Sequence, residues 1–76
     1  MQNYLIIAES EEGGYEPVGE AVNNQEACEI AASDMRRRKK ELEAGQAPMC
    51  PFQYNLWGRD RYGSFKPLAQ IQAEEL

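Results

Sequence analysis

Residues 4–21 read YLIIAESEEGGYEPVGEA, and residues 54–71, fifty positions later, read YNLWGRDRYGSFKPLAQI. Aligned without gaps, the two stretches are identical at only three of eighteen positions, but their structural landmarks fall in the same places. The shared landmarks are Tyr4 and Tyr54, Gly13 and Gly63, Tyr15 and Phe65, and Pro17 and Pro67. Landmarks that agree in phase indicate that the chain contains one supersecondary unit twice.

Each stretch has the pattern of a β-hairpin. A strand rich in aromatic and branched residues leads into the turn sequence SEEG at 10–13 in the first copy and DRYG at 60–63 in the second. Ser or Asp at the first turn position accepts hydrogen bonds from backbone amides, and the glycine adopts positive φ. Both sequences therefore predict a type I turn closed by a glycine bulge. A proline donates no backbone hydrogen bond, so Pro17 and Pro67 predict that both returning strands are edge strands.

Residues 24–44, between the hairpins, have the pattern of one α-helix. Asn23 and Glu26 form a capping box at its start, and Gly45 stands where a helix ends in the left-handed conformation. Acidic residues come early in this segment and basic residues late, as the helix dipole prefers. One apolar stripe is expected to face the sheet. It comprises Ala27, Ile30, Ala31, Met35 and Leu42, with Cys28 at its rim.

These elements predict a single α+β domain over residues 1–76 with the order ββαββ. Its parts are a hairpin at 3–21, a helix at 24–44, a second hairpin at 53–71 and a short C-terminal tail at 72–76. Because both proline strands belong at edges, we expect one four-stranded antiparallel sheet in the order 2-1-3-4. A pseudo-two-fold axis then lies between the two central strands. One helix covers only one face of such a sheet.

Strand alternation divides the side chains of the central strands between two faces. The small side chains of Ala8 and Gly58 permit close approach of a helix, so we assign their face to the core. That face carries Tyr4, Ile6, Ala8, Tyr54, Leu56 and Gly58. The open face carries Leu5, Ile7, Asn55 and Trp57, and monomeric proteins rarely leave such an apolar patch bare. On the sequence alone the reverse assignment, with Trp57 in the core, stays open. Val18 and Leu68 join the open face unless a bulge at each proline turns them over.

Composition excludes several classes of function. The chain has 76 residues, of which 42% are hydrophobic and 28% charged, which is typical of a small globular domain. It contains no histidine, which is the commonest general base and metal ligand, so its serines lack an activating partner. Glu9, Glu11 and Glu12 are expected in a flexible turn, not in a catalytic environment. We predict no enzyme activity, no catalytic residue, no cofactor, no metal and no small-molecule substrate.

The net charge of −5 is unevenly distributed along the chain. Residues 1–34 contain eight acidic and no basic residues, whereas residues 35–76 contain all eight basic residues and five acidic ones. Attraction between the two halves inside one fold explains this asymmetry, and a steering field for a charged partner is the alternative. The negative total argues against general nucleic-acid binding, in which neutralisation of phosphates dominates the affinity.

The basic residues concentrate in the run RRRKK at 36–40. Five successive residues point in all directions around a helix, so we expect a solvated helix surface in preference to a binding patch. Arg36 and Lys40 share one face, on which pairing with Glu29 or Glu43 is expected. The alternative is a nucleic-acid-binding module that combines this run with the aromatic residues of the second hairpin.

Arg38 is exceptional within that run, because it projects from the middle of the apolar stripe. We expect its side chain to extend over the end of the sheet or to pair with a carboxylate of the first hairpin. An Arg38 that does neither would be a contact for a partner.

Cys28 and Cys50 are too few for a disulfide framework or a zinc site. The predicted helix separates Cys28 from the end of the helix by a greater distance than the residues between that end and Cys50 can span. The two thiols are therefore not expected to form a disulfide. We expect two free thiols that act as packing residues in a reducing cytoplasm. The opening residues lack the features of a signal peptide, and no apolar run approaches the ~18 residues of a membrane helix.

The segment from Tyr4 to Met35 contains the turn EGGY at 12–15 and the pair Glu26-Ala27 at the start of the helix. With these residues it resembles the start of the small antitoxin domains of the HicB type. The third strand that those domains place before the helix is absent, and a second hairpin follows the helix instead. The resemblance implies a bacterial regulator that binds protein. An inhibitor that is encoded by a phage and docks on a host protein also fits the size and acidity.

The predicted function is therefore non-enzymatic: homodimer formation, or binding of another protein, through the open sheet face. An anchor of this kind is typically a tryptophan at the centre of an apolar patch. The candidate partner-binding residues are Leu5, Ile7, Trp57 and Arg38.

Overall fold

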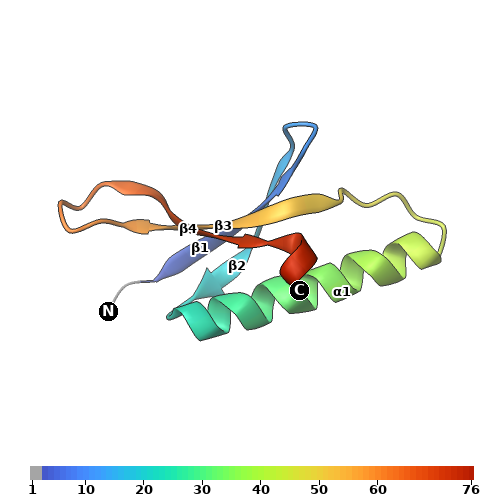
Figure 1. Cartoon of the computed structure of the whole chain (residues 1–76), viewed down its shortest axis with the longest axis horizontal. Helices are drawn as coiled ribbons and strands as arrows, with labels where there is room; N and C mark the ends of the chain where they lie inside the picture. The colour runs from blue at the N-terminus through green and yellow to red at the C-terminus, as the bar shows by residue number, and fades with distance from the viewer. Residues whose placement is uncertain (1–2) are drawn as a thin grey trace.

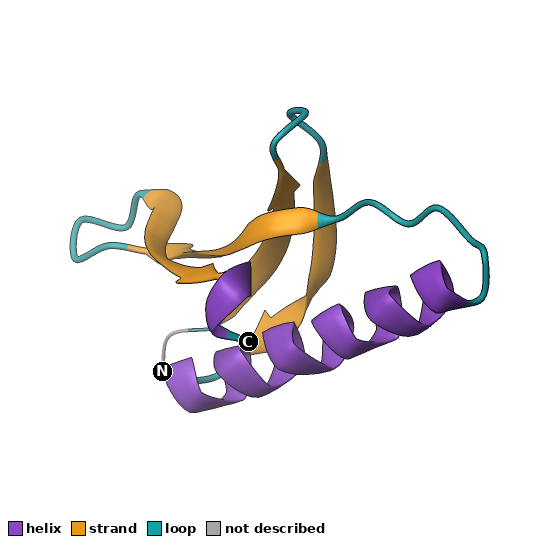
Figure 2. Ribbon diagram, turned by 45° about the vertical axis from the view of Figure 1, so that its right-hand side comes forward, coloured by secondary structure: helices purple, strands orange, loops and turns teal. Residues whose placement is uncertain are grey.

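The computed structural model describes residues 3–76 and confirms the α+β architecture (Figure 1). In chain order the elements are β1 (Tyr4–Ser10), β2 (Tyr15–Ala21), α1 (Asn24–Glu43), β3 (Pro51–Arg59), β4 (Phe65–Gln72) and the 3-10 turn η1 (Ala73–Glu75). The strands form one antiparallel sheet in the predicted order β2-β1-β3-β4. The helix α1 lies along one face of this sheet (Figure 2).

Both hairpin turns have the predicted conformation. In the first turn, the amide of Gly13 donates to the carbonyl of Ser10 at 3.0 Å, and in the second Gly63 donates to Asp60 at 3.0 Å. The two glycines have φ values of 90° and 82°, which side chains with a Cβ rarely adopt. The first turn position also acts as expected, because Oδ1 of Asp60 accepts two backbone amides of its own turn.

The ends of α1 follow the predicted capping signals. Oδ1 of Asn23 accepts a hydrogen bond from the amide of Glu26 at 2.8 Å, which satisfies a backbone donor that the first turn leaves free. At the other end the helix stops at Glu43, and Gly45 has the positive φ of a C-terminal glycine, 85°.

The two hairpins are related inside the sheet as the repeat predicts. Ile6 pairs directly with Leu56, its counterpart in the repeat, so the pseudo-two-fold axis passes through this pair. Each hairpin contains a β-bulge at the same place, where the extra residue without a partner is Val18 in the first and Leu68 in the second. The first bulge turns Val18 toward the core, where its side chain is partly buried. Val18 therefore leaves the open face, which is the effect that a bulge at the proline was expected to have.

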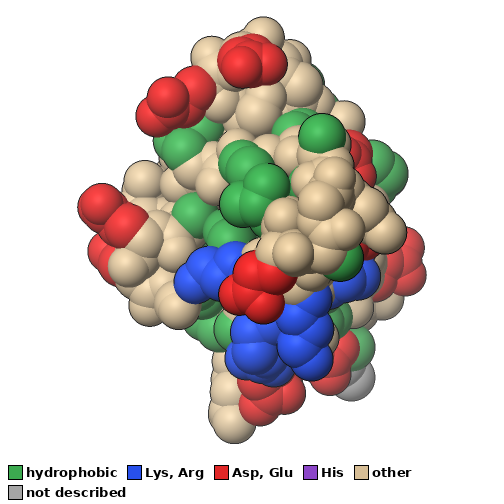
Figure 3. Space-filling model, turned by 90° about the vertical axis from the view of Figure 1, so that its right-hand side faces the viewer, with side chains coloured by type: hydrophobic (Ala, Val, Ile, Leu, Met, Phe, Trp, Pro, Cys, Tyr) green, Lys and Arg blue, Asp and Glu red, His purple; other side chains and the backbone are tan. Residues whose placement is uncertain are grey.

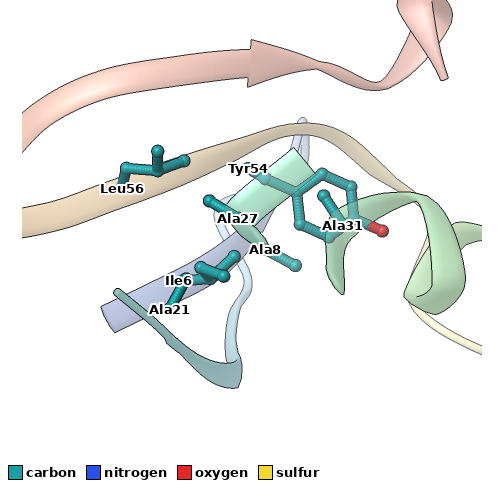
Figure 4. Close-up of a cluster of buried hydrophobic side chains, with 7 residues drawn as sticks. All are labelled: Ile6, Ala8, Ala21, Ala27, Ala31, Tyr54 and Leu56. Carbon is teal, nitrogen blue, oxygen red and sulfur yellow. The ribbon is translucent and has the colours of Figure 1, made fainter. Parts of the chain in front are cut away.

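The core is small and made mostly of small side chains. Its fully buried hydrophobic residues are Ile6, Ala8, Ala21, Ala27, Ala31, Tyr54 and Leu56. The ring of Tyr54 reaches from β3 to α1 beside Ala31 (Figure 4). The helix packs against β2 and β1, whereas η1 packs against β3. The tail predicted at 72–76 thus contributes a helical turn beside the central strand.

The predicted apolar stripe of α1 is correct as far as Met35, which packs against the core, and wrong at Leu42. The buried residues of α1 are Ala27, Ala31, Asp34 and Arg38, whereas the side chain of Leu42 is 57% exposed. The reason is that the last turns of α1 extend beyond the strands, on the right in Figure 1, so no sheet lies over Leu42.

Two further observations concern the thiols and the membrane. Cys28 and Cys50 are both free and both exposed, so the expectation that they are packing residues is wrong.

Within residues 3–76, no helix combines the length and the apolar character that crossing a membrane requires.

Candidate functional site: the open face of the sheet

The face of the sheet opposite α1 carries the predicted patch. In the register between β1 and β3, Leu5 lies beside Trp57 and Ile7 beside Asn55. The alternate residues of both strands, Ile6 and Leu56 among them, are buried on the helix side. The assignment of faces is therefore confirmed, and Trp57 does not belong to the core under α1.

Edge strands extend this patch in both directions. Pro67 lies beside Trp57, and Pro17 lies beside Ile7. The ring of Phe65 packs against Trp57, with 5.6 Å between ring centroids, and 46% of Phe65 remains exposed. We call the set Leu5, Ile7, Pro17, Trp57, Phe65 and Pro67 the apolar patch. It reaches across all four strands without a helix over it.

A polar cluster occupies the other end of the same face. Oε1 of Glu9 accepts hydrogen bonds from Nε2 of Gln53 at 2.8 Å and from Nδ2 of Asn55 at 2.9 Å. The hydroxyl of Tyr15 donates to the other oxygen of Glu9 at 3.2 Å, and Nε2 of Gln72 donates to Gln53 at 3.2 Å. These five residues, the polar cluster, also connect all four strands. Asn55 is only 6% exposed.

The polar cluster fixes the charge of Glu9. Hydrogen bonds from Asn55, Gln53 and Tyr15 favour the ionised carboxylate and hold the pKa of Glu9 below its ordinary value. At neutral pH this carboxylate accepts hydrogen bonds and has no proton to donate. The expectation that Glu9 lies in a flexible turn is wrong, because the residue belongs to β1.

Arg38 lies on the opposite side of the sheet and is 4% exposed. Its Nε donates to Oδ2 of Asp34 at 2.7 Å, and its Nη1 donates to the carbonyl of Met49 at 2.9 Å. The guanidinium also forms an ion pair with Glu16 of β2, with 3.3 Å between Nη2 and Oε1. The predicted pairing with a carboxylate of the first hairpin is confirmed. Since Arg38 is buried and bonded to Asp34 of α1, Glu16 of β2 and the segment before β3, we do not include it in the candidate surface.

Tyr54 completes this buried network, because its hydroxyl donates to Oδ2 of Asp34 at 2.7 Å. Burial alone would raise the pKa of Asp34, but hydrogen bonds from Arg38, Tyr54 and Arg37 outweigh it and hold the pKa below its ordinary value. Burial and the neighbouring carboxylate raise the pKa of Tyr54. The network stays in one protonation state at neutral pH and joins α1 to the sheet.

The remaining basic residues of the run behave differently from Arg38. Arg37 pairs with Asp34 at 2.6 Å and with Glu41 at 3.2 Å. Among residues 3–76, however, neither Glu29 nor Glu43 forms an ion pair with the run, so that expectation is wrong.

The nucleic-acid alternative required this run and the second hairpin to form one surface. The turn between β3 and β4 and the C-terminal part of α1 lie at opposite ends of the molecule (Figure 1), whose longest dimension is 45 Å. The fold therefore does not bring the turn of the second hairpin, with its exposed aromatic residues, to the basic run.

Comparisons with known proteins add nothing to these observations: the chain matches no protein-family model, no curated protein and no solved structure. Within residues 3–76, no group of three His, Cys, Asp or Glu side chains is placed to hold a metal ion. The function of this chain is therefore inferred from its own residues.

Sequence reasoning missed the polar cluster and the part played by Phe65. Both follow from the strand register: continuing the pair Ile7 and Asn55 by two residues brings Glu9 beside Gln53. The proline bulge shifts β4 by one position, and this shift places Phe65 on the face of Trp57. A register extended through both hairpins would have found the first contact. The second also requires the position of the bulge.

Proposed function

We propose that this protein is a non-enzymatic interaction domain that forms a homodimer, in which the open sheet faces of two copies pack together. The observation that carries the proposal is the apolar patch around Trp57, which no element within residues 3–76 covers. Contiguous apolar surface of this kind is typical of an interface. The neighbouring polar cluster can enter the same interface, because the carboxylate of Glu9 already has hydrogen-bond donors.

The size of the core supports a permanent partner. Four of its seven fully buried hydrophobic residues are alanines, which contribute little apolar area. A domain of this length obtains only about 3–5 kcal/mol from one core, so burial of a second face is a substantial addition. A second copy of the chain is the partner that is always present when the chain is.

The edges of the sheet favour association through faces. A strand can add to a sheet only where an edge offers a regular row of backbone donors and acceptors. Pro17 and Pro67 each remove a donor from an edge strand, and a bulge follows each proline along the chain. Two faces related by a two-fold axis bury the same patch on both copies and form a closed dimer.

The thiols support a cytoplasmic location for this dimer. Cys28 and Cys50 are both free and both exposed, and exposed thiols persist in a reducing compartment.

Light scattering at micromolar concentration tests the proposal. We expect twice the mass of one chain at both low and high salt, because apolar association depends little on ionic strength. A single-chain mass over the whole concentration range would overturn self-association and leave a foreign protein as the occupant of the face.

Two matched variants locate the interface. Leu5→Lys places a charge in the apolar patch and should yield a folded monomer. Tyr62→Lys places the same charge on a side chain that is 78% exposed in a turn, and should leave the dimer intact. Trp57→Ala should weaken the dimer by more than ~1 kcal/mol, as expected for an anchor residue. Equal masses for Leu5→Lys and Tyr62→Lys would contradict an interface on this face.

A further inference from the structure

The solvent-facing flank of α1 has a shallow hollow of about 450 Å³, whose lining includes Arg36, Lys40 and the ion pair of Arg37 with Glu41. Figure 3 views the molecule from the end at which α1 terminates, where Lys and Arg side chains gather over the helix with acidic side chains among them. Arg38 is the one buried residue of the basic run, and the other four residues of the run are exposed.

Three of these four exposed cations lack an acidic partner within residues 3–76. Among residues 3–76, Arg36, Lys39 and Lys40 take part in none of the ion pairs of the structure, and all three are exposed. We call these three residues the cationic face. By contrast, Arg37 and Arg38 both bind the carboxylate of Asp34.

The sequence of α1 explains why Arg36 is unpaired. Side chains pair along a helix at spacings of three and four residues. For Arg36 these positions hold Ala32, Ser33, Lys39 and Lys40, so it has two cations and no acid within reach. Like charges at this spacing destabilise a helix. The helix dipole compensates only near the C-terminus, and Lys40 alone of the three lies in the last turn.

We propose that the cationic face binds an acidic segment of a partner protein. Arg36 and Lys40 lie one helical turn apart, about 6 Å along the axis, which matches carboxylates one turn apart on a facing helix. A nucleic acid fits less well. The chain carries a net charge of −5, and the exposed aromatic residues at the turn of the second hairpin, Tyr62 and Phe65, lie at the far end of the molecule. This binding does not depend on the homodimer, because α1 lies on the face opposite the apolar patch.

A synthetic helical peptide with glutamates spaced four residues apart is a suitable probe, measured by fluorescence anisotropy against the full chain at low salt. The double variant Arg36→Gln, Lys40→Gln should weaken binding about four- to twenty-fivefold, since each of two exposed ion pairs contributes a factor of about two to five. Neither side chain enters an ion pair within residues 3–76, so the variant is expected to fold. The matched control Arg61→Gln, Lys66→Gln removes the same charge from the second hairpin and should weaken binding less than about twofold.

Four results would overturn the proposal. They are no binding of the peptide by the unmodified chain, equal weakening in the two double variants, equal binding of a peptide with glutamine in place of glutamate, and tighter binding of a single-stranded or duplex oligonucleotide than of the peptide. The second result would indicate non-specific attraction, and the last a phosphate-binding surface. None of them alters the mass of the protein in light scattering, so the two proposals fail independently.

Discussion

Nε of Arg38 lies 2.7 Å from Oδ2 of Asp34, one helical turn earlier, and both side chains are buried. The other contacts of α1 with the core are apolar: they are made by the buried Ala27 and Ala31 and the partly buried Ile30 and Met35. The ion pair also connects β2, through Glu16, and the segment before β3, through the carbonyl of Met49. Burial of an ion pair contributes little net stability, but the loss of one partner leaves an uncompensated charge. Loss of either partner should therefore destabilise the packing of α1 against the sheet.

Asp34→Asn should lower the free energy of unfolding by about 3–5 kcal/mol, because the guanidinium of Arg38 then stays buried without its carboxylate. Urea denaturation at neutral pH measures this change. The control Glu41→Gln removes a carboxylate from a surface ion pair of α1 and should change stability by less than about 1 kcal/mol. A loss below about 1 kcal/mol for Asp34→Asn would contradict the importance of the buried pair.

Stability should fall in acid. The folded-state pKa of Asp34 lies below its ordinary value of 3.8, and that of Glu9 lies below 4.5. The contribution of each carboxylate is therefore fully present above its ordinary pKa and is lost as the pH falls through its folded-state pKa. We expect the urea midpoint to be constant from pH 7 to about 5 and to decrease below about 4. Asp34→Asn should flatten this decrease, and an equally steep curve for the variant would assign the acid sensitivity to other groups.

Stability should also fall at high pH, because burial and the carboxylate of Asp34 raise the pKa of Tyr54 above 10.0. The stabilising effect of a raised pKa is fully present below the unfolded value and is lost as the pH rises toward the folded value. Tyr54→Phe should lower stability at pH 7 by about 2 kcal/mol, through loss of a hydrogen bond to a charged group, and should reduce the alkaline decrease. Tyr62→Phe, at an exposed turn position, is the control and should change neither quantity. An unaltered alkaline limb in Tyr54→Phe would show that another group titrates there.

Arg36→Gln should raise the melting temperature slightly, by the equivalent of a few tenths of a kcal/mol, because it removes repulsion from Lys39 and Lys40. The neighbouring change Arg37→Gln should lower it, since Arg37 binds both Asp34 and Glu41. Both effects should shrink when salt screens the surface charges. Calorimetry at two salt concentrations measures them, and a lower melting temperature for Arg36→Gln would reveal a stabilising contact of that residue.

Local signals in the sequence predicted most of the fold. The turns follow from Gly13 and Gly63, which supply the positive φ that each turn requires, and the start of the helix follows from Asn23. Strand alternation then assigned the faces correctly, because successive side chains of a strand point to opposite faces and one of the two faces is buried. These features depend on residues close together in the chain.

The contacts that sequence reasoning missed depend on residues far apart in the chain. Arg38 can be buried in the second half of α1 because the segment before β3 places the carbonyl of Met49 within hydrogen-bond distance of its guanidinium. The exposure of Leu42 depends on how far the helix extends past the sheet, and a helical stripe gives no information about the length of the strands it faces. The bonds of Glu9 depend on pairing between strands that lie more than forty residues apart.

The pairing of β1 with β3, centred on Ile6 and Leu56, differs in folding behaviour from the pairing inside each hairpin. Each hairpin closes over a few residues, whereas the pairing of β1 with β3 must first enclose β2, α1 and the segment that follows it. Contacts that close such long loops form late, because the chain loses entropy before they stabilise it. The hydrogen bonds between β1 and β3 should therefore form last during folding and break first during unfolding. Each hairpin should keep its own strand pairing while they do so.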